Sequence, residues 1–138
     1  MIDNFSGEYS FLDNSSKSEI FLGDRKYASV EHFYQAGKAN TLKDHEYVRT
    51  AATPEEAKER ANEIETREDW EDIKDKYMTL GLMLKFDINE LGDMLIATGD
   101  TDIAPDTILG ELLMQVRDQV LDRRSKQVTY YGEEQVLH

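Results

Sequence analysis

A carboxylate, an amide and an amine are spaced along one helical stripe in the ten residues from Ser29 to Lys38. If Ser29 caps a helix here, these three groups stand at i, i+4 and i+7 and follow one another along one stripe. They belong to Glu31, Gln35 and Lys38. A row of this kind could bind a polar substrate and exchange a proton with it. The alternative is a solvated helix face with weak side-chain pairs, which has the same spacing.

The elements that must position this stripe are short strands first and helices afterwards. Short strands are predicted at 9–12, 20–22 and 25–28, and the turn Gly23-Asp24 joins the last two into a hairpin. Caps and apolar periodicity predict helices over about 30–40, 54–65, 69–86, 88–97 and 108–120. Capping boxes at 53–56 and 87–90 begin two of them. The predicted fold class is therefore mainly α (α+β), a multihelical single domain with a small N-terminal β element.

Composition limits the possible partners. The chain has 138 residues, 29 Asp and Glu against 16 Lys and Arg, and a formal net charge of −13. Such a field repels long polyanions, so no tracking of duplex nucleic acid is expected. A small anionic nucleotide remains possible, because a few local cations can hold a phosphate. No apolar run reaches membrane-spanning length, so we expect no membrane partner and a cytoplasmic protein.

Metal and thiol chemistry are not expected either. The chain contains no cysteine, which removes thiolate ligands, thiol nucleophiles and disulfides. Its histidines, His32, His45 and His138, are scattered without the spacing of metal ligands. We therefore predict neither a metal site nor a cofactor. The polar residues 125–138 form a tail in which 128–131 would add a strand or stay loose.

Several segments, in order, resemble the NADAR family of YbiA-like proteins. From Tyr27 to Lys38 the match is Tyr-x-Ser-Val-Glu-His-x-Tyr-Gln-Ala-x-Lys. The others are Tyr9-Ser10-Phe11-Leu12 with Asn14, Pro54-x-x-Ala57-Lys58, Trp70-x-x-Ile73-Lys74-x-x-x-Met78, Leu84-Lys85-Phe86, Ala97-Thr98-Gly99-Asp100, and Leu109-Gly110-x-Leu112-Leu113-Met114-x-Val116-Arg117. The resemblance covers residues 5 to about 121 of a single domain spanning 1–138, and a compact, acidic chain of this kind would suit a phage-encoded member acting in the host cytoplasm.

This resemblance implies an N-glycosidase or ADP-ribosyl hydrolase that acts on a ribosylated or ADP-ribosylated nucleobase or amine. Breaking a ribose C–N bond passes through an oxocarbenium-like state, which requires an acid and nearby negative charge. The catalytic residues it implies are Glu31 as carboxylate, Lys38 as Schiff-base amine and Asp100 as a loop carboxylate. The substrate-binding residues it implies are Phe11, Asn14, Tyr34, Gln35, Trp70, Thr98 and Gly99. Without the family, Trp70 would be a core anchor and Asp100 a plain turn residue.

Departures from the family pattern leave a second function open. Members usually carry a Trp-Gly loop after the Thr-Gly-Asp element, yet Asp100 and Leu109 stand only nine positions apart here. Pro105-Asp106-Thr107 occupies the place of a Gly-x-Asn, and Ser15-Ser16-Lys17 follows Asn14 in place of an aromatic-proline ending. The alternative is therefore a non-catalytic module that sequesters an ADP-ribose or NAD-type nucleotide. A structural protein without a ligand is a third interpretation, which would leave the polar residues in order unexplained.

Overall fold

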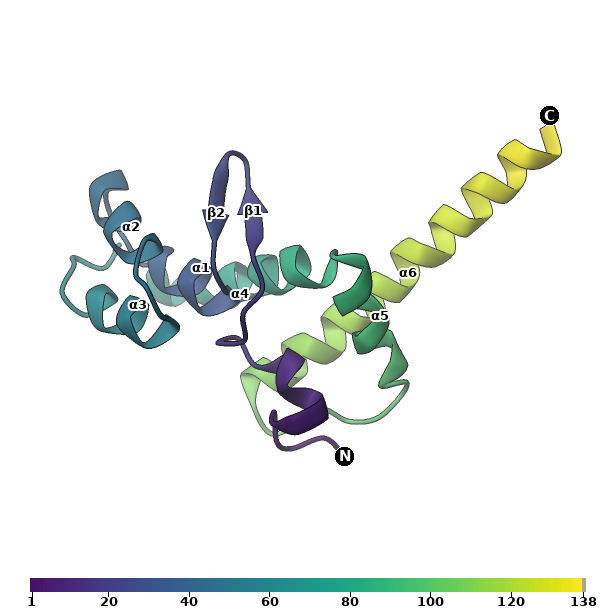
Figure 1. The fold of residues 1–138 in the computed structure, drawn as a ribbon, viewed down its shortest axis with the longest axis horizontal. Helices are drawn as coiled ribbons and strands as arrows, with labels where there is room; N and C mark the ends of the chain where they lie inside the picture. Colours follow the sequence, from purple (N-terminus) through teal and green to yellow (C-terminus); the bar gives the residue numbers. More distant parts are fainter. Residues whose placement is uncertain (138) are drawn as a thin grey trace. The chain divides into compact units, whose positions relative to one another are not determined.

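A computed structural model describes residues 1–137, with side chains through residue 126. The chain divides into two compact units, residues 5–85 and residues 1–4 together with the chain from Phe86 onward, and each is described by itself. Most described residues lie in helices, and the strands among them form one two-stranded sheet (Figure 1). The predicted mainly α (α+β) class is therefore confirmed.

The first unit holds a 3-10 helix, a β-hairpin and four α-helices (Figure 1). In chain order they are η1 (Gly7–Leu12), β1 (Ile20–Leu22), β2 (Arg25–Tyr27), α1 (Val30–Ala36), α2 (Leu42–Arg49), α3 (Pro54–Ala61) and α4 (Trp70–Phe86), whose last residue belongs to the second unit. The hairpin has the predicted register, because Leu22 pairs with Arg25 and leaves Gly23-Asp24 as its turn. The glycine has φ of +63°, which suits the first position of a tight hairpin turn.

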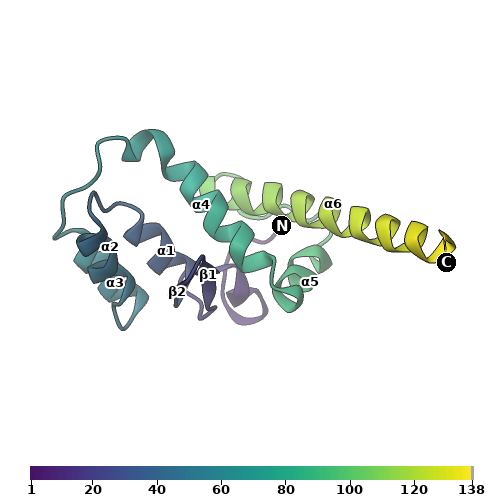
Figure 2. The ribbon, with the colours of Figure 1, turned by 90° about the horizontal axis from the view of Figure 1, so that it is seen from above.

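The helices α2 and α3 both pack on α1 (Figures 1 and 2). The apolar side of α1 is fully buried at Val30, Phe33 and Ala36. A buried histidine adds a polar link, since His32 contacts the Ser29 hydroxyl through Nδ1 at 2.8 Å and the Ala51 carbonyl through Nε2 at 2.9 Å. These contacts fix the orientation of α1, on which the predicted stripe begins.

The helix α1 begins as predicted and ends early. The Ser29 hydroxyl accepts a hydrogen bond from the His32 amide at 3.1 Å, which confirms the cap. The prediction that the helix extends to about Asn40 is wrong, because α1 ends at Ala36. A β-carbon on Gly37 would lie 2.3 Å from the Tyr77 ring, and Ala39 pairs with Thr66 in an isolated bridge. The helix therefore ends at its C-cap residue Gly37, and the chain beyond it pairs with a distant segment.

The helix α3 shows the same behaviour at its end. Thr53 caps it by accepting the Glu56 amide at 3.0 Å, and the Glu56 carboxylate accepts the Ala52 amide at 2.8 Å, one residue before the cap. The predicted end near Glu65 is wrong, since α3 stops at Ala61. The chain must become extended before Thr66 to pair with Ala39.

The predicted strand at 9–12 is also wrong. These residues belong to η1, in which the amide of Tyr9 donates to Ser6 and that of Asp13 donates to Ser10. A lone strand leaves its backbone groups without partners, whereas a 3-10 helix satisfies them locally. Within this 3-10 helix Leu12 is buried and Phe11 is half-buried.

The second unit consists of α5 (Asn89–Ala97), α6 (Ile108–Leu137) and the N-terminal residues. The two helices contact each other, and Ile2 forms a parallel bridge with Ile103. The capping box at 87–90 is wrong by one position, because Ile88 is the cap residue of α5 and makes no side-chain cap bond. The helix α6 continues through 128–131, where a strand or a loose tail was predicted, since helix-forming residues extend the helix beyond Val120. None of the described helices is long and apolar enough to span a membrane.

Candidate functional site

The candidate site begins with Glu31 and Gln35 on α1. Gln35 Nε2 donates a 2.6 Å hydrogen bond to Glu31 Oε1, one helical turn earlier. Glu31 is half-buried in the first turn, where the helix dipole stabilises a carboxylate, and Gln35 is only 4% exposed. The pair predicted from the i, i+4 spacing therefore exists, and it is buried deeply enough to be more than a solvated surface contact.

Asn14 lies against the start of the same helix. Its backbone carbonyl accepts the Glu31 amide at 3.0 Å, and its side-chain Nδ2 donates to Met78 Sδ at 3.2 Å. The first amides of a helix have no partner within the helix, so this carbonyl satisfies one of them. Asn14, predicted to bind substrate, is thus joined directly to Glu31.

Two buried carbonyl oxygens next to Glu31 have no hydrogen-bond partner. They are Asn14 Oδ1 and Gln35 Oε1, on side chains that are 7% and 4% exposed. A buried acceptor without a donor costs free energy, and native structures satisfy nearly all such groups with protein, ordered water or ligand. Both oxygens are shut off from solvent, so a ligand hydroxyl or amino group donates a hydrogen bond to them only if neighbouring side chains move.

Lys38 lies beyond the end of α1 and not on the helix, so its predicted place two turns along the same helical stripe is wrong. Its side chain is half-buried, and its backbone carbonyl accepts the Arg67 amide at 2.8 Å. Burial lowers the pKa of the Lys38 amine; Glu31 opposes this effect, whereas Lys58 adds to it. A lower pKa raises the fraction of neutral amine, which is the form that attacks a carbonyl carbon.

Tyr34 and Trp70 form an aromatic contact beside these groups. Their ring centroids are 5.0 Å apart in an edge-to-face arrangement, and Trp70 also contacts Tyr77 at 5.8 Å. Burial raises the pKa of the Tyr34 hydroxyl. Trp70 is 5% exposed, so its packing is that of a core anchor, and a role in stacking on substrate stays a prediction. Phe11, on η1, is half-buried in the same unit.

Thr98, Gly99 and Asp100 belong to the second unit, after α5. Asp100 is exposed, and Gly99 has φ of +64°. The Thr98 hydroxyl donates to the Leu95 carbonyl at 2.6 Å and accepts from Arg117 Nη1 at 3.0 Å. Arg117 also donates to the Thr101 carbonyl at 2.7 Å. The loop is therefore built around a buried arginine, and the catalytic role of Asp100 and the substrate-binding roles of Thr98 and Gly99 stay predictions.

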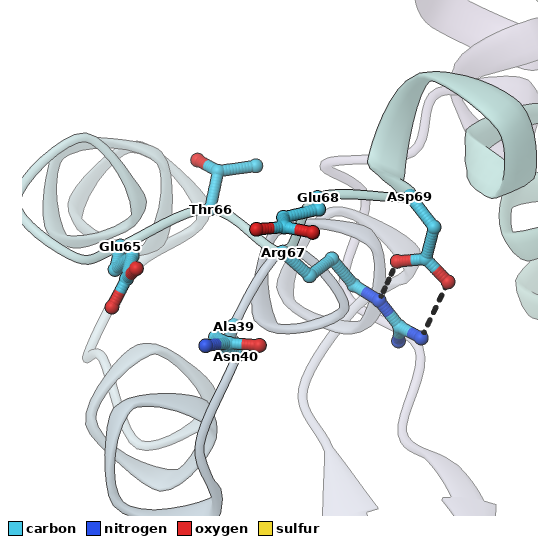
Figure 3. A pocket seen from close by; sticks show the side chains of 7 residues that line it. All are labelled: Ala39, Asn40, Glu65, Thr66, Arg67, Glu68 and Asp69. Atoms are coloured by element: carbon cyan, nitrogen blue, oxygen red, sulfur yellow. Dashed lines mark hydrogen bonds and ion pairs between the residues drawn. The ribbon is translucent and has the colours of Figure 1, made fainter.

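The first unit also contains a polar pocket of about 500 Å³ that the sequence did not predict (Figure 3). Its walls are the segment after α1 and the segment between α3 and α4, namely Ala39, Asn40, Glu65, Thr66, Arg67, Glu68 and Asp69. The guanidinium of Arg67 is already paired, because its Nε and Nη2 donate hydrogen bonds to the Asp69 carboxylate at 2.6 and 3.1 Å. One of its lining residues, Arg67, is next to Lys38, because the Arg67 amide donates a hydrogen bond to the Lys38 carbonyl. Loop residues without periodicity gave no signal for it.

The sequence also gave no site role to two basic residues whose hydrogen-bond partners lie next to or among the predicted site residues. They are Arg117, and Lys85 near the end of α4. Both are buried, at 8% and 0% exposure. Apolar neighbours on both sides, Leu84 and Phe86, were the available signal that Lys85 faces the interior. Among the described residues, no group of three or more His, Asp or Glu side chains is arranged to hold a metal ion.

Comparison with known proteins identifies relatives over most of the chain. Residues 2–108 match the NADAR domain. N-glycosidase Npun_R5314 of Nostoc punctiforme is 30% identical over 134 residues, which cover 81% of this chain and 86% of that protein. N-glycosidase YbiA of Escherichia coli (strain K12) is 27% identical over 136 residues, covering 83% of this chain and 84% of YbiA.

Two further similarities are of different kinds. Riboflavin biosynthesis protein VVA0006 of Vibrio vulnificus is 29% identical over 131 residues, covering 81% of this chain but only 36% of that protein. The NMR structure of E. coli YbiA superimposes with a TM-score of 0.80 at 24% identity, covering 89% of this chain and 86% of YbiA. The last similarity shows a shared fold.

Proposed function

Because the chain belongs to the NADAR family, we propose that it is an N-glycosidase that hydrolyses the bond between a ribose carbon and a nitrogen of a nucleobase or amine. Two of its relatives are N-glycosidases by name. The relative named for riboflavin biosynthesis supports a ribosylated amine as one substrate class, and an ADP-ribosylated nucleobase is the other. No cofactor takes part in this proposal.

The observation that carries the proposal is the set of acceptors around Glu31. Asn14 Oδ1 and Gln35 Oε1 are buried without partners, and each belongs to a residue hydrogen-bonded to Glu31. A ribose presents hydroxyl groups that donate hydrogen bonds to such oxygens. Binding would then remove the cost of two unsatisfied acceptors and would hold the sugar beside the carboxylate.

The chemistry follows from the sugar's position. Glu31 gives a proton to the leaving nitrogen, the electron pair of the C–N bond passes to that nitrogen, and the ribose carbon becomes oxocarbenium-like. The ionised carboxylate stabilises this cation, and water then adds to the carbon and returns a proton to Glu31. Lys38 offers a second route, in which its neutral amine adds to C1 of the opened sugar, where the leaving nitrogen is held as an imine. That nitrogen is expelled as the free amine, and water then hydrolyses the Schiff base to release the sugar aldehyde and the free lysine. Asp100 is proposed to bind ribose hydroxyls or to act as the base.

The shortened segment between Asp100 and Leu109 favours one other function, sequestration of an ADP-ribose or NAD-type nucleotide without turnover. The two functions share the same ligand chemistry and differ in whether a base or amine is released. The hydrolase would be a compact enzyme that acts in the cytoplasm, phage-encoded or not, and the sequestering protein would be a binding module.

The test is release of guanosine and ADP-ribose from an ADP-ribosylated guanosine, and of free amine from a ribosylaminopyrimidine phosphate, with the products separated by chromatography. Glu31→Gln keeps the shape of the side chain but supplies neither proton nor negative charge, so we expect turnover to fall about 10²–10⁴-fold with binding retained. The matched control is Glu55→Gln on the exposed surface of α3, which should leave turnover unchanged. Binding of both compounds without release by the parent protein would overturn the hydrolase and leave the sequestering module.

A further inference from the structure

Lys85 lies in the last turn of α4 and is completely buried. Its Nζ donates to the Asp13 carbonyl at 3.1 Å and to the Ser16 hydroxyl at 3.0 Å. A lysine is rarely buried to this extent, because removing its charge from water is costly. Burial lowers the pKa of the Lys85 amine to about 8, and the nearby Asp13 carboxylate opposes this shift. An apolar side chain of similar length would fill the same space without that cost, so the amine must serve its hydrogen-bond partners.

Those partners lie on the two sides of Asn14. The chain turns from Asp13 to Ser16, and the Asp13 carbonyl accepts both the Ser16 amide at 3.1 Å and the Ser16 hydroxyl at 2.8 Å. The Asp13 carboxylate accepts the Ser15 amide at 2.8 Å. Lys85 bonds to the first and last residues of this turn from a different part of the chain, so it fixes the turn against α4.

The Asp13–Ser16 turn is hydrogen-bonded to the start of α1. The Asn14 carbonyl accepts the Glu31 amide at 3.0 Å. Glu31 is the second residue of α1, so its amide has no partner inside the helix, and the Asn14 carbonyl is an external one. A chain of contacts therefore runs from the Lys85 amine through the Asn14 turn to the backbone of the carboxylate residue.

We propose that Lys85 is a positioning residue that holds Asn14 and Glu31 in the arrangement that the reaction requires. It touches no reacting atom. Its effect on turnover rests on the proposed N-glycosidase function, whereas its effect on the turn does not. Misplacing a catalytic group by about 1 Å can cost about 10²-fold in rate, so a small movement of the turn is sufficient to be measured.

The first test measures backbone amide hydrogen exchange by NMR in the parent protein and in Lys85→Met, which fills the buried space without donating a hydrogen bond. We expect exchange at the Glu31 amide to accelerate at least about tenfold, because its acceptor becomes mobile. The His32 amide is an internal control, since the Ser29 hydroxyl accepts it at 3.1 Å and does not depend on the turn. Lys76→Met, an exposed position of α4, is the matched control variant.

A second variant covers the case in which Lys85→Met does not fold. Ser16→Ala removes one acceptor of the Lys85 amine from a half-buried position, and it should accelerate exchange at Glu31 in the same direction with a smaller change. Unchanged exchange at Glu31 in whichever of the two variants folds would overturn the proposal, as would equal acceleration at Glu31 and His32.

The second test is kinetic and uses the compound that the parent protein turns over. A positioning role predicts that Lys85→Met lowers kcat about 10–10²-fold while KM changes less than about threefold, because alignment of Glu31 is lost and the ligand contacts remain. Unchanged kcat at a temperature where the variant is folded would overturn the proposal. If the parent protein releases no base or amine, the proposed function fails, and the exchange experiment still decides whether Lys85 fixes the turn.

Discussion

The contact between Gly37 and Tyr77 predicts a specific loss of stability when Gly37 is replaced by alanine. Gly37 has ordinary helical dihedral angles, with φ of −62°, so an added methyl group causes no backbone strain. The methyl carbon would lie 2.3, 2.7 and 2.7 Å from three carbons of the Tyr77 ring. Ordinary contact begins at 3.4 Å, so the ring would have to retreat by 3.4 − 2.3, or about 1 Å.

The Tyr77 ring is half-buried and is restrained by two other rings. It stacks on Phe33 with centroids 4.6 Å apart and an interplanar angle of 21°, and it contacts the edge of Trp70 at 5.8 Å. Phe33 is fully buried. Overpacking of this kind costs about 1–3 kcal/mol, and replacing glycine by alanine returns about 0.4–1 kcal/mol through the unfolded chain. We therefore expect Gly37→Ala to lower the free energy of unfolding by about 1.3 kcal/mol, and by no more than about 2.6 kcal/mol.

Urea denaturation measures this change as a lower midpoint with an unchanged slope. The reasoning is tested by repeating Gly37→Ala in a Tyr77→Leu background, where the ring that blocks the methyl group is gone. There the alanine should cost nothing or should stabilise by up to about 1 kcal/mol, which gives a coupling between the two positions of about 1–3 kcal/mol. Equal losses in both backgrounds would show that the ring contact is not the cause.

Three further predictions concern titration and a buried cation. Burial lowers the pKa of His45 in the folded protein, so the unfolded chain binds the proton more readily. The stability that depends on a neutral His45 is therefore present above about pH 6.5 and is lost as the pH falls through the folded pKa. We expect His45→Gln to weaken the fall in urea midpoint between pH 7.5 and 5.5. The folded pKa of Lys85 is about 8 against an unperturbed 10.5, so stability relative to Lys85→Met should rise from pH 7.5 to 9.5, by on the order of 1–3 kcal/mol, and a pH-independent difference would contradict the assignment. Arg117→Met should destabilise the protein by about 1–3 kcal/mol in urea denaturation, because Thr98 and the Thr101 carbonyl lose their donor; full recovery by Arg117→Lys would show that charge alone matters.

Local signals in the sequence predicted where most helices begin. Ser29 and Thr53 are caps whose hydroxyl oxygens accept amides of the first turn, and such bonds depend only on residues a few positions apart. Helix ends were predicted less well. Gly37, the C-cap of α1, is a local signal for its end, whereas the pairing of Ala39 with Thr66 just beyond it is encoded by no local pattern.

The candidate site divides in the same way. The bond between Glu31 and Gln35 followed from helical spacing, because both residues lie on one turn of one helix. The contact of Asn14 with Glu31 joins separate segments; the family resemblance named both as site residues but predicted no contact between them. Lys85 was missed as a site residue, since a lysine on a helix is usually solvated and its burial depends on how α4 packs.

The pairing of Ala39 with Thr66, together with the bond from the Arg67 amide to the Lys38 carbonyl, brings two distant points of the chain to one place. Residues 40–65, which include α2 and α3, therefore form an excursion that leaves and returns at the same position. The entropy of closing such a loop grows only slowly with its length, so insertions into its turns alter the closure cost little. This makes the excursion a natural place for a chain of this fold to gain or lose length, and a suitable point for inserting a reporter domain without moving the residues on either side.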